Sequence, residues 1–287
     1  MKIQTKKIKL PFKLFSWQSD IVKGVLSHPH DIHIAKSKRQ IGKSVTVEVL
    51  LLYYAVNKIN SCSICISPTL TQSRKIYKEI VKGLQNTPVY ESSNSTVLEI
   101  TLTNGSVIKF RSGEQREGLR GETVTGILCF DEAVFISDEV IYNCLPFVDA
   151  NRSPIVMFST PKFKTGVFYD FYKKACECEK GFHCYDINNY DTSVLLSKER
   201  LEMYRKSVAP QIFKSEYLGL FIEAVSTVFG DVEKLCGTTL HTASQRTMGI
   251  DWSNGAMDKS GNPDETALVI MNEFNEMEMC EAFSDKE

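Results

Sequence analysis

The sequence predicts an α/β fold in which a mainly parallel sheet carries helices on both faces. Short runs rich in β-branched residues alternate with longer helical patterns from about residue 31 to residue 187, and this alternation is typical of parallel sheets. The composition supports a folded core, because 43% of the 287 residues are hydrophobic and 24% are charged. This length suits one large domain or two modest ones.

The alternating region predicts the following elements in chain order. They are a strand at 31–35, a helix at 43–57, a strand at 62–67, a helix near 70–86, a hairpin within 97–110, and buried strands at 127–131 and 155–159. The hairpin is indicated by Asn104-Gly105, a dipeptide that favours tight β-turns. Ligands of such sheets bind beyond the carboxyl ends of the strands, so we expect functional residues directly after each strand.

The pattern changes near residue 222. A stretch rich in Thr, Gly and Ser leads to three strand-like runs, RTMGIDW, TALVIMNEF and EMEMCEAF. Three strands without a covering helix do not make a complete domain. We therefore expect a first domain over residues 1–222 and, over residues 223–287, a linker followed by an incomplete second domain.

Several classes of protein are disfavoured by composition. The most apolar stretch, VTVEVLLLYYAV, is shorter than the ~20 residues of a membrane span and contains Glu48. The Lys-rich start lacks the features of a signal peptide, and nine scattered cysteines suit a reducing compartment. We expect a soluble, intracellular protein. The net charge is −1, but Lys and Arg dominate residues 1–43. Two interpretations of this basic segment stay open: its charges contact the phosphates of a nucleotide or of DNA, or they only keep the surface solvated.

A phosphate-binding pattern follows the first predicted strand. Residues 37–44 (SKRQIGKS) match a P-loop, with Ser37 in place of the usual first glycine. In a P-loop, backbone N–H groups cradle phosphates, a lysine such as Lys43 reaches the β/γ oxygens, and a hydroxyl such as Ser44 binds Mg²⁺. The alternative, a polar turn that only caps a helix, is disfavoured by the flanking strand and helix. The expected ATP-binding residues are Ser37, Lys38, Arg39, Gln40, Ile41, Gly42, Lys43 and Ser44.

Two carboxylates end the strand at 127–131. Asp131 is placed to hold the Mg²⁺ water shell, and Glu132 to orient or deprotonate the water that attacks the γ-phosphate. The alternative is an acidic N-cap of the next helix. Because a P-loop lies upstream in the same alternating pattern, we favour one catalytic site built from both segments.

Hydroxyl residues end the next buried strand. Ser159 and Thr160, followed by Pro161, are placed to sense the γ-phosphate and couple hydrolysis to movement. A strand-ending turn with proline is the structural alternative for this segment.

These residues resemble the large terminase subunit, the DNA-packaging motor of tailed bacteriophages and their prophages. Arg39 inside the P-loop resembles the family's cis-acting arginine finger, and Gln18 resembles its adenine-contacting glutamine. Further resembling segments are Ser67-Pro-Thr with Gln72, Leu119-Arg-Gly-Glu-Thr-Val, Ser159-Thr-Pro and Phe213-Lys-Ser-Glu-Tyr-Leu-Gly. In the last segment we expect Glu216 and Tyr217 to mark a helix end rather than a site.

The resemblance covers residues ~10–225 and implies a P-loop NTPase fold of the RecA/ASCE type. It implies an ATP-hydrolysing motor with Glu132, Arg39 and Lys43 in catalysis, Mg²⁺ at Ser44 and Asp131, and coupling through Ser159 and Thr160. The implied partners are double-stranded DNA, the portal protein, the small terminase subunit and further copies of the chain in a ring on the portal, with no membrane partner. The implied location is the cytoplasm of the bacterial host.

The tail resembles the opening strands of the family's RNase H-like nuclease. Met248-Gly-Ile-Asp251-Trp and Asp264-Glu-Thr-Ala-Leu-Val-Ile carry this resemblance. It implies that Asp251 is the first of several carboxylates that hold two Mg²⁺ or Mn²⁺ ions. The later acids of that cluster normally lie beyond the length of this sequence, so we expect little nuclease activity.

Two other functions compete with the terminase hypothesis. A superfamily-2 DNA helicase also has a glutamine ahead of the P-loop, a GKS motif and a DE motif. A helicase needs a second RecA-like domain of similar size, however, and the residues after 222 are too few and show a different pattern. A truncated, non-catalytic prophage remnant or regulatory module is disfavoured because Lys43, Ser44, Asp131, Glu132 and Arg39 are all present.

Overall fold

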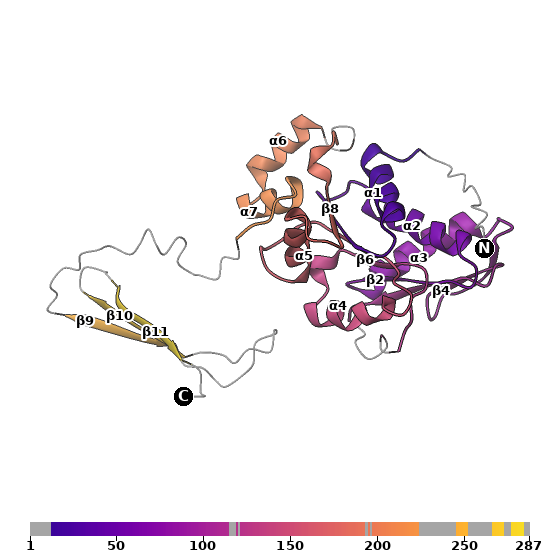
Figure 1. Cartoon of the computed structure of the whole chain (residues 1–287). Coiled ribbons are helices and arrows are strands. Elements are labelled where there is room, and N and C mark those ends of the chain that lie inside the picture. Colours follow the sequence, from indigo (N-terminus) through magenta and orange to yellow (C-terminus); the bar gives the residue numbers. More distant parts are fainter. Residues whose placement is uncertain are drawn as a thin grey trace. The chain divides into compact units, whose positions relative to one another are not determined.

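The computed structural model describes residues 13–114, 119, 121–192, 195, 197–223, 245–251, 266–272 and 277–283. Two compact units divide the chain, Met1–Ala224 and Val225–Glu287. Figure 1 shows the first unit as a sheet surrounded by helices and the second as a small sheet.

The first unit is built on an eight-stranded, mainly parallel sheet. Its strand order is β3-β4-β5-β2-β6-β7-β1-β8, and every pairing from β5 to β8 is parallel. The strands are β1 (Ile32–Lys36), β2 (Cys62–Ser67), β3 (Tyr90–Asn94), β4 (Glu99–Leu102), β5 (Val107–Ser112), β6 (Leu128–Asp131), β7 (Ile155–Ser159) and β8 (Phe182–Asp186). The predicted α/β class is confirmed.

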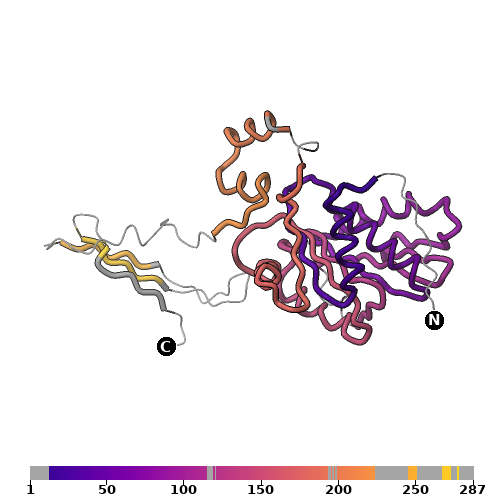
Figure 2. The backbone as a smooth tube through the Cα atoms, turned by 45° about the horizontal axis from the view of Figure 1, so that its top comes forward, coloured from indigo at the N-terminus to yellow at the C-terminus, as the bar shows by residue number. Residues whose placement is uncertain are grey.

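Helices cover both faces of this sheet (Figures 1 and 2). The helices are α1 (Ser16–Ser27), α2 (Lys43–Asn57), α3 (Leu70–Leu84), α4 (Asp138–Cys144), α5 (Val167–Cys176), α6 (Lys198–Ser207) and α7 (Pro210–Ile212). Shorter helical turns are η2 (Ala133–Phe135), η3 (Leu145–Val148), η4 (Ile187–Asn189) and the π-helical turn η5 (Phe213–Tyr217).

Two apolar cores lie on opposite faces of the sheet. In the first core, α1, α2 and α3 pack on side chains such as Cys65 and Phe158, and in the second core α4 and α5 pack on neighbours such as Ile66 and Met157. Successive strand residues point to opposite faces, so a strand between two cores must be apolar throughout. All residues of β6 and β7 are buried, which explains their continuous runs of apolar side chains.

The strand order brings three loops of the sequence to one edge of the sheet. Strand β7 lies between β1 and β6, with Ser159 beside Lys36 and Phe158 beside Asp131. Because the three strands are parallel, the loops that follow their carboxyl ends meet at this edge. The P-loop and the residues after β6 and β7 therefore lie together at the carboxyl ends of β1, β6 and β7.

The predicted hairpin is present as the antiparallel pair β4–β5. Gly105 adopts φ +79° in its turn, and a Cβ there would lie 2.1 Å from Asn60 Oδ1, so the turn requires glycine. Strand β3 was not predicted. Its sequence YESSN is polar and largely exposed because the strand lies at the edge of the sheet.

The second unit contains the three predicted tail strands. They are β9 (Arg246–Asp251), β10 (Thr266–Asn272) and β11 (Met277–Phe283), which form an antiparallel sheet in the order β11-β10-β9. Asp264 lies outside the described residues.

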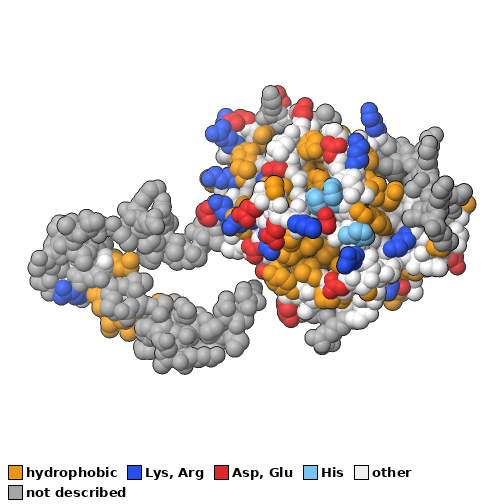
Figure 3. Space-filling model, viewed as in Figure 1, with side chains coloured by type: hydrophobic (Ala, Val, Ile, Leu, Met, Phe, Trp, Pro, Cys, Tyr) orange, Lys and Arg blue, Asp and Glu red, His pale blue; other side chains and the backbone are white. Residues whose placement is uncertain are grey.

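The surface of the first unit carries mixed charge. On the face seen in Figure 3, histidine side chains lie among apolar, basic and acidic ones, and neither sign of charge dominates. In the part of the chain that the structure describes, every helix is too short or too polar to cross a membrane.

Candidate active site

The P-loop connects β1 to α2 through two residues of left-handed backbone conformation. Gln40 has φ +57° and Gly42, the N-cap of α2, has φ +88°. Gly42 takes this conformation without strain because it lacks a Cβ. The turn presents the N-terminus of α2, whose unpaired N–H groups and dipole favour an anion such as phosphate.

Lys43 is held by two partners from the neighbouring strand ends. Its Nζ lies 2.9 Å from Glu132 Oε1 and donates to Thr160 Oγ1 at 2.5 Å. The lysine side chain is only 6% exposed, so its charge depends on these partners. The structure thus brings together one predicted residue from each of the three loops.

Glu132 adopts a strained conformation that aims its carboxylate back at this cluster. It has φ +54°, which is unfavourable for a non-glycine residue and is often found at functional sites. Its Oε2 accepts hydrogen bonds from Thr160 N at 3.3 Å and from Ser159 Oγ at 3.4 Å. Glu132 occupies the N-cap position of η2 but makes no side-chain capping bond there, so capping does not explain where its carboxylate points.

Asp131 is buried at the end of β6 with one carboxylate oxygen, Oδ1, that lacks a partner among the described residues. Burial and the charge of Glu132 raise the pKa of Asp131 to about 7, against the opposing charge of Lys43. A buried carboxylate oxygen without a partner suits a hard cation, since Mg²⁺ binds one or two carboxylates together with phosphates. Asp131 fits a Mg²⁺ site, and Ser44 is the second residue of α2, at the end of the P-loop.

Burial also raises the pKa of Glu48, on α2, to about 7, and the charges of Glu79 and Asp131 add to this effect. Glu48 is therefore electrostatically coupled to Asp131, the expected Mg²⁺ ligand. The sequence prediction missed this residue, because a single glutamate inside an apolar helical run carries no recognisable pattern.

Ser159 and Thr160 contact both the P-loop and the carboxylate of Glu132. The carbonyl of Ser159 accepts from Ser37 N at 3.1 Å, and its Oγ accepts from Val134 N at 3.2 Å. Thr160 reaches Lys43 and Glu132 as described above. Ser159 and Thr160 are therefore positioned to sense changes both in the P-loop and at Glu132.

Gln18 joins α1 to the P-loop. Its Oε1 accepts from Phe15 N at 2.9 Å, and its Nε2 donates to Gly42 O at 3.1 Å. Each amide atom of a glutamine can make a further hydrogen bond, so Gln18 retains capacity for a base.

Arg39 lies apart from the cluster of Lys43, Glu132 and Thr160. Its side chain is 65% exposed, and its Nε lies 3.6 Å from Glu216 Oε2 on η5. Its backbone N–H also donates to Glu216 O at 2.9 Å. The expectation that Glu216 only marks a helix end is therefore incomplete, because the residue contacts the P-loop twice.

A cavity of about 250 Å³ borders the P-loop on this side. Its other walls come from α6, η5 and the preceding loop, and the rings of Tyr204 and Tyr217 lie 4.7 Å apart in it. The full lining is Lys38, Arg39, Gln40, Ile41, Thr192, Leu195, Arg200, Tyr204 and Tyr217. The sequence did not predict the α6 residues, because α6 is too polar to show a clear buried face.

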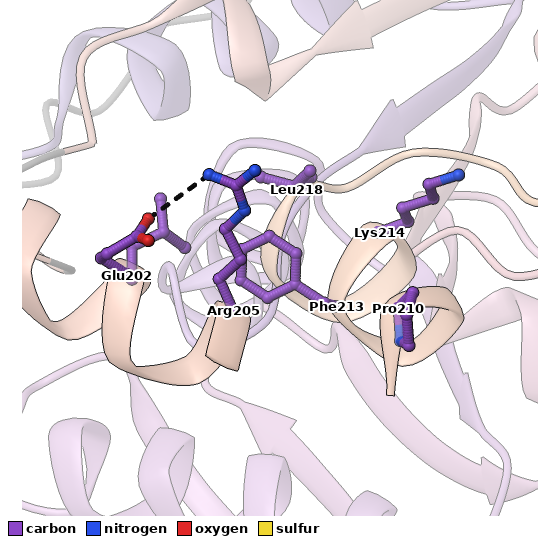
Figure 4. Close-up of a pocket in the computed structure, with 7 residues that line it drawn as sticks. Glu202, Arg205, Pro210, Phe213, Lys214 and Leu218 are labelled. Atoms are coloured by element: carbon purple, nitrogen blue, oxygen red, sulfur yellow. Dashed lines mark ion pairs between the residues drawn. The ribbon is translucent and has the colours of Figure 1, made fainter. Parts of the chain in front are cut away.

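A larger cavity of about 600 Å³ lies between α6 and the α7–η5 turn (Figure 4). Phe213 and Arg205 point into it, and Arg205 pairs with Glu202 at 3.6 Å. None of the predicted site residues lines this cavity.

In the second unit, Asp251 ends β9. Its backbone neighbour on β10 is Ala267, whose own neighbour on β11 is Ala282. The row of residues that contains Asp251 therefore carries no second carboxylate on the described strands.

Comparison with known proteins identifies the family. Residues 37–232 match the model of the terminase large subunit, T4likevirus-type, N-terminal domain. The chain belongs to the terminase large-subunit family. As a large terminase subunit, it is an ATPase of a phage DNA-packaging motor, and the resemblance stated from its motifs is confirmed. No curated protein matches this terminase chain in sequence.

Solved large terminases share its fold. The Thermus phage P74-26 large terminase ATPase domain is 19% identical with a TM-score of 0.64, over 74% of this chain and 95% of that one. The large terminase of a thermophilic bacteriophage, solved in complex with ADP, is 14% identical with a TM-score of 0.60, over 94% of this chain and 68% of that one. The HK97 bacteriophage large terminase is 19% identical with a TM-score of 0.63, over 96% of this chain and 64% of that one.

Proposed function

We propose that this terminase chain hydrolyses Mg·ATP at the edge formed by β1, β6 and β7 and uses the energy to translocate double-stranded viral DNA into a procapsid. The observation that carries the proposal is the meeting of Lys43, Glu132 and Thr160 within hydrogen-bonding distance. A large terminase of known structure binds ADP and ATP-γ-S, which supports nucleotide as the ligand of the P-loop.

Nucleotide binding rearranges the charges of the site. The phosphates of ATP lie against the N–H groups at the start of α2 and compete with Glu132 for the charge of Lys43. Ser44 and Asp131 would hold Mg²⁺, which neutralises phosphate charge. Gln18 contacts the base from its position beside Gly42.

Release of Glu132 from Lys43 frees its carboxylate to orient or deprotonate the attacking water. The hydrogen bonds from Thr160 N and Ser159 Oγ keep Oε2 at the strand edge while Oε1 changes partner. Arg39 then moves to the γ-phosphate and stabilises the charge of the transition state.

Ser159 and Thr160 transmit the change of partners at Lys43 and Glu132 to the segment that follows β7. The carbonyl of the next residue, Pro161, accepts a hydrogen bond from Ser215 Oγ at 2.6 Å, so the segment is tied to η5. Loss or gain of the Thr160–Lys43 bond during the ATP cycle therefore acts on the region that precedes the second unit.

The partners proposed with this motor are double-stranded DNA, the portal protein, the small terminase subunit and copies of the chain in a ring, in the cytoplasm of the bacterial host. DNA contacts to backbone phosphates make DNA binding weaken steeply with salt. We do not propose a nuclease function with Mg²⁺ or Mn²⁺ at Asp251, because its neighbours on the described strands are Ala267 and Ala282.

The test is steady-state ATP hydrolysis by the purified chain with Mg²⁺, with EDTA in a parallel sample. Asp131→Asn should lose Mg²⁺-dependent hydrolysis, whereas the matched variant of exposed Asp149, Asp149→Asn, should keep it. Hydrolysis that persists in EDTA or in Asp131→Asn would refute the proposed site.

A further inference from the structure

Two cysteine thiols lie in contact where α5 packs on β8. Cys176 is the last residue of α5, Cys184 is the middle residue of β8, and their Sγ atoms lie 3.7 Å apart. Cys176 is exposed and Cys184 is half-buried. A reagent in solvent therefore reaches the pair through Cys176.

A short turn of fixed geometry joins the two elements that carry these thiols. Cys178 N donates to Ala175 O at 3.2 Å, and Phe182 N donates to Glu179 O at 3.2 Å. The ring centroids of Phe171 and Phe182 lie 5.3 Å apart, so the helix packs directly on the strand. The surrounding fold therefore holds the two thiols beside each other.

A second pair of neighbouring cysteines serves as an internal comparison. Cys65 on β2 lies beside Cys129 on β6 in the register of the sheet, and both residues are fully buried. Burial raises the pKa of both thiols, and a buried thiol of this kind is chemically inert. Neighbouring thiols are thus not enough for reactivity, and the exposure of Cys176 distinguishes the pair at α5 and β8.

The two thiols of the exposed pair have different environments. Burial raises the pKa of the Cys184 thiol to about 11, and the hydrogen bond and charge of Cys176 add to this shift. Cys184 is therefore protonated at neutral pH, and Cys176 is the thiol that attacks first. Conversion of Cys176 into a disulfide removes its charge, so Cys184 then ionises more readily.

Neighbouring cysteines can also serve as ligands of a metal ion. A structural zinc site takes further Cys or His ligands beyond such a pair. Within the described ranges, no group of three or more His, Cys, Asp and Glu side chains could hold a metal ion. Two thiols without further ligands suit disulfide chemistry instead.

We propose that Cys176 and Cys184 form a dithiol site that reacts with a small organic disulfide, such as oxidised glutathione, and closes into an intramolecular disulfide. The Cys176 thiolate attacks one sulfur of the organic disulfide, so a mixed disulfide forms and one small thiolate leaves. The Cys184 thiolate then attacks Cys176 Sγ and expels the second small thiolate. The two cysteines are oxidised, the organic disulfide is reduced to two thiols, and the two cysteine protons end on those thiols.

The new bond fastens a strand at the edge of the sheet. Strand β8 lies at the end of the strand order beside β1, and its Asp186 pairs with Lys36, the residue before the P-loop, at 2.7 Å. A covalent bond to α5 gives β8 a second support. In a reducing compartment the pair stays in the dithiol form, and the disulfide forms when small disulfides accumulate. This inference does not depend on the proposed function.

The experiment incubates the reduced full chain with a series of mixtures of oxidised and reduced glutathione, blocks the remaining thiols and maps the tryptic peptides by mass spectrometry. Trypsin places Cys176 and Cys184 in separate peptides, 175–180 and 181–198, which the disulfide should join. The neighbouring thiol displaces glutathione at a high effective concentration, so the mixed disulfide should make up less than about one tenth of the oxidised product. Cys65 and Cys129 should stay reduced throughout.

Three variants identify the residues that are joined. Cys178 shares a tryptic peptide with Cys176, so Cys178→Ser is the matched control and should keep the link. Cys176→Ser should lose the link, and Cys184→Ser should lose it while glutathione stays on Cys176. Hydrogen exchange of the backbone amides of residues 182–186 should slow in the linked chain, because β8 has gained a support.

Three results would overturn the inference. The first is a link that persists in Cys176→Ser or disappears in Cys178→Ser, which would place the disulfide at another residue. The second is a wild-type chain in which glutathione accumulates on Cys176 while Cys184 stays reduced, or in which both stay reduced at ratios that modify Cys178. The third is a linked chain whose amide exchange in β8 equals that of the reduced chain.

Discussion

Lys43 Nζ lies 2.9 Å from Glu132 Oε1, so the two residues proposed to act on ATP contact each other directly. The pair comes from the P-loop and from the end of β6, and Thr160 at the end of β7 contacts both residues. Charge-assisted contacts of this kind are stronger than neutral hydrogen bonds. In the proposed function the phosphates of ATP compete with Glu132 for Lys43, and this competition links binding to activation.

Removal of the Lys43 side chain should weaken nucleotide binding and abolish hydrolysis. Lys43→Ala deletes the charge that meets the β/γ-phosphates and leaves Glu132 without its cationic partner. Binding of a fluorescent ATP analogue measures the affinity, and phosphate release measures turnover. Lys82→Ala, at an exposed lysine of α3, is the control, and unchanged affinity in Lys43→Ala would contradict the role of the P-loop lysine.

Removal of Arg39 should reduce kcat with little change in ATP affinity. An arginine finger acts mainly on transition-state charge and is worth about 10³- to 10⁵-fold in rate. Arg39→Ala is compared with Arg74→Ala, which alters an exposed arginine of α3. Equal losses of affinity and turnover would make Arg39 a simple phosphate anchor, and an unchanged rate would assign the finger to a neighbouring subunit.

His33 should make the stability of the first unit depend on pH. The residue lies fully buried in β1, and burial lowers its pKa to about 4. The His28 carbonyl and the charge of Asp31 oppose this shift, whereas His183 adds to it, and Tyr185 OH bonds to the ring. His33 therefore takes up a proton near pH 6.5 in the unfolded chain but only near pH 4 in the folded chain. Because the unfolded chain binds more protons between these values, the free energy of unfolding should fall as the pH drops from 6.5 towards 4.

The measurement is the free energy of unfolding in denaturant between about pH 4.5 and about pH 7.5, the range in which the shift acts. The loss at the acid end should approach about 3 kcal/mol at most for this one group. His33→Gln should lose that part of the pH dependence, and His30→Gln, at an exposed histidine, should retain it. A pH profile of His33→Gln that matches the wild type would contradict this assignment.

Much of the fold and the meeting of Lys43 with Glu132 could be predicted because both follow from local pattern. The strands β1, β2, β6 and β7 are buried apolar runs, and the rule that ligands bind beyond parallel strands placed Lys43 and Glu132 at one edge. The P-loop and DE motifs then supplied the residue types for ATP chemistry.

The contact between Arg39 and Glu216 could not be predicted in this way. It joins segments far apart in sequence, and a glutamate at a helix end has many structural explanations. Edge strand β3 was missed because its polar sequence depends on pairing with β4 rather than on burial. The expected adenine contact of Gln18 and the coupling role of Ser159 and Thr160 remain predictions, now supported by their contacts with the P-loop.

The second unit should show little or no metal-dependent DNA cleavage. Two-metal hydrolysis needs several carboxylates that bridge ions about 3.5–4 Å apart. The row of Asp251 continues through Ala267 and Ala282, and Glu281 lies in the adjacent row beside Leu268. Plasmid nicking with Mn²⁺ or Mg²⁺ by the chain and by Asp251→Ala tests this expectation. Robust cleavage that Asp251→Ala abolishes would show a working nuclease.

The most direct test of the proposed ATPase site is the variant Glu132→Gln. Glutamine keeps the shape of the side chain but cannot accept a proton from water, so ATP should still bind while hydrolysis falls by about 10²- to 10⁴-fold. Equilibrium binding of a fluorescent ATP analogue and single-turnover hydrolysis of bound ATP should be measured on the same preparation. Retained binding with lost turnover is the result that the geometry of Lys43, Glu132 and Thr160 predicts. Hydrolysis at the wild-type rate in Glu132→Gln would contradict the catalytic role of Glu132.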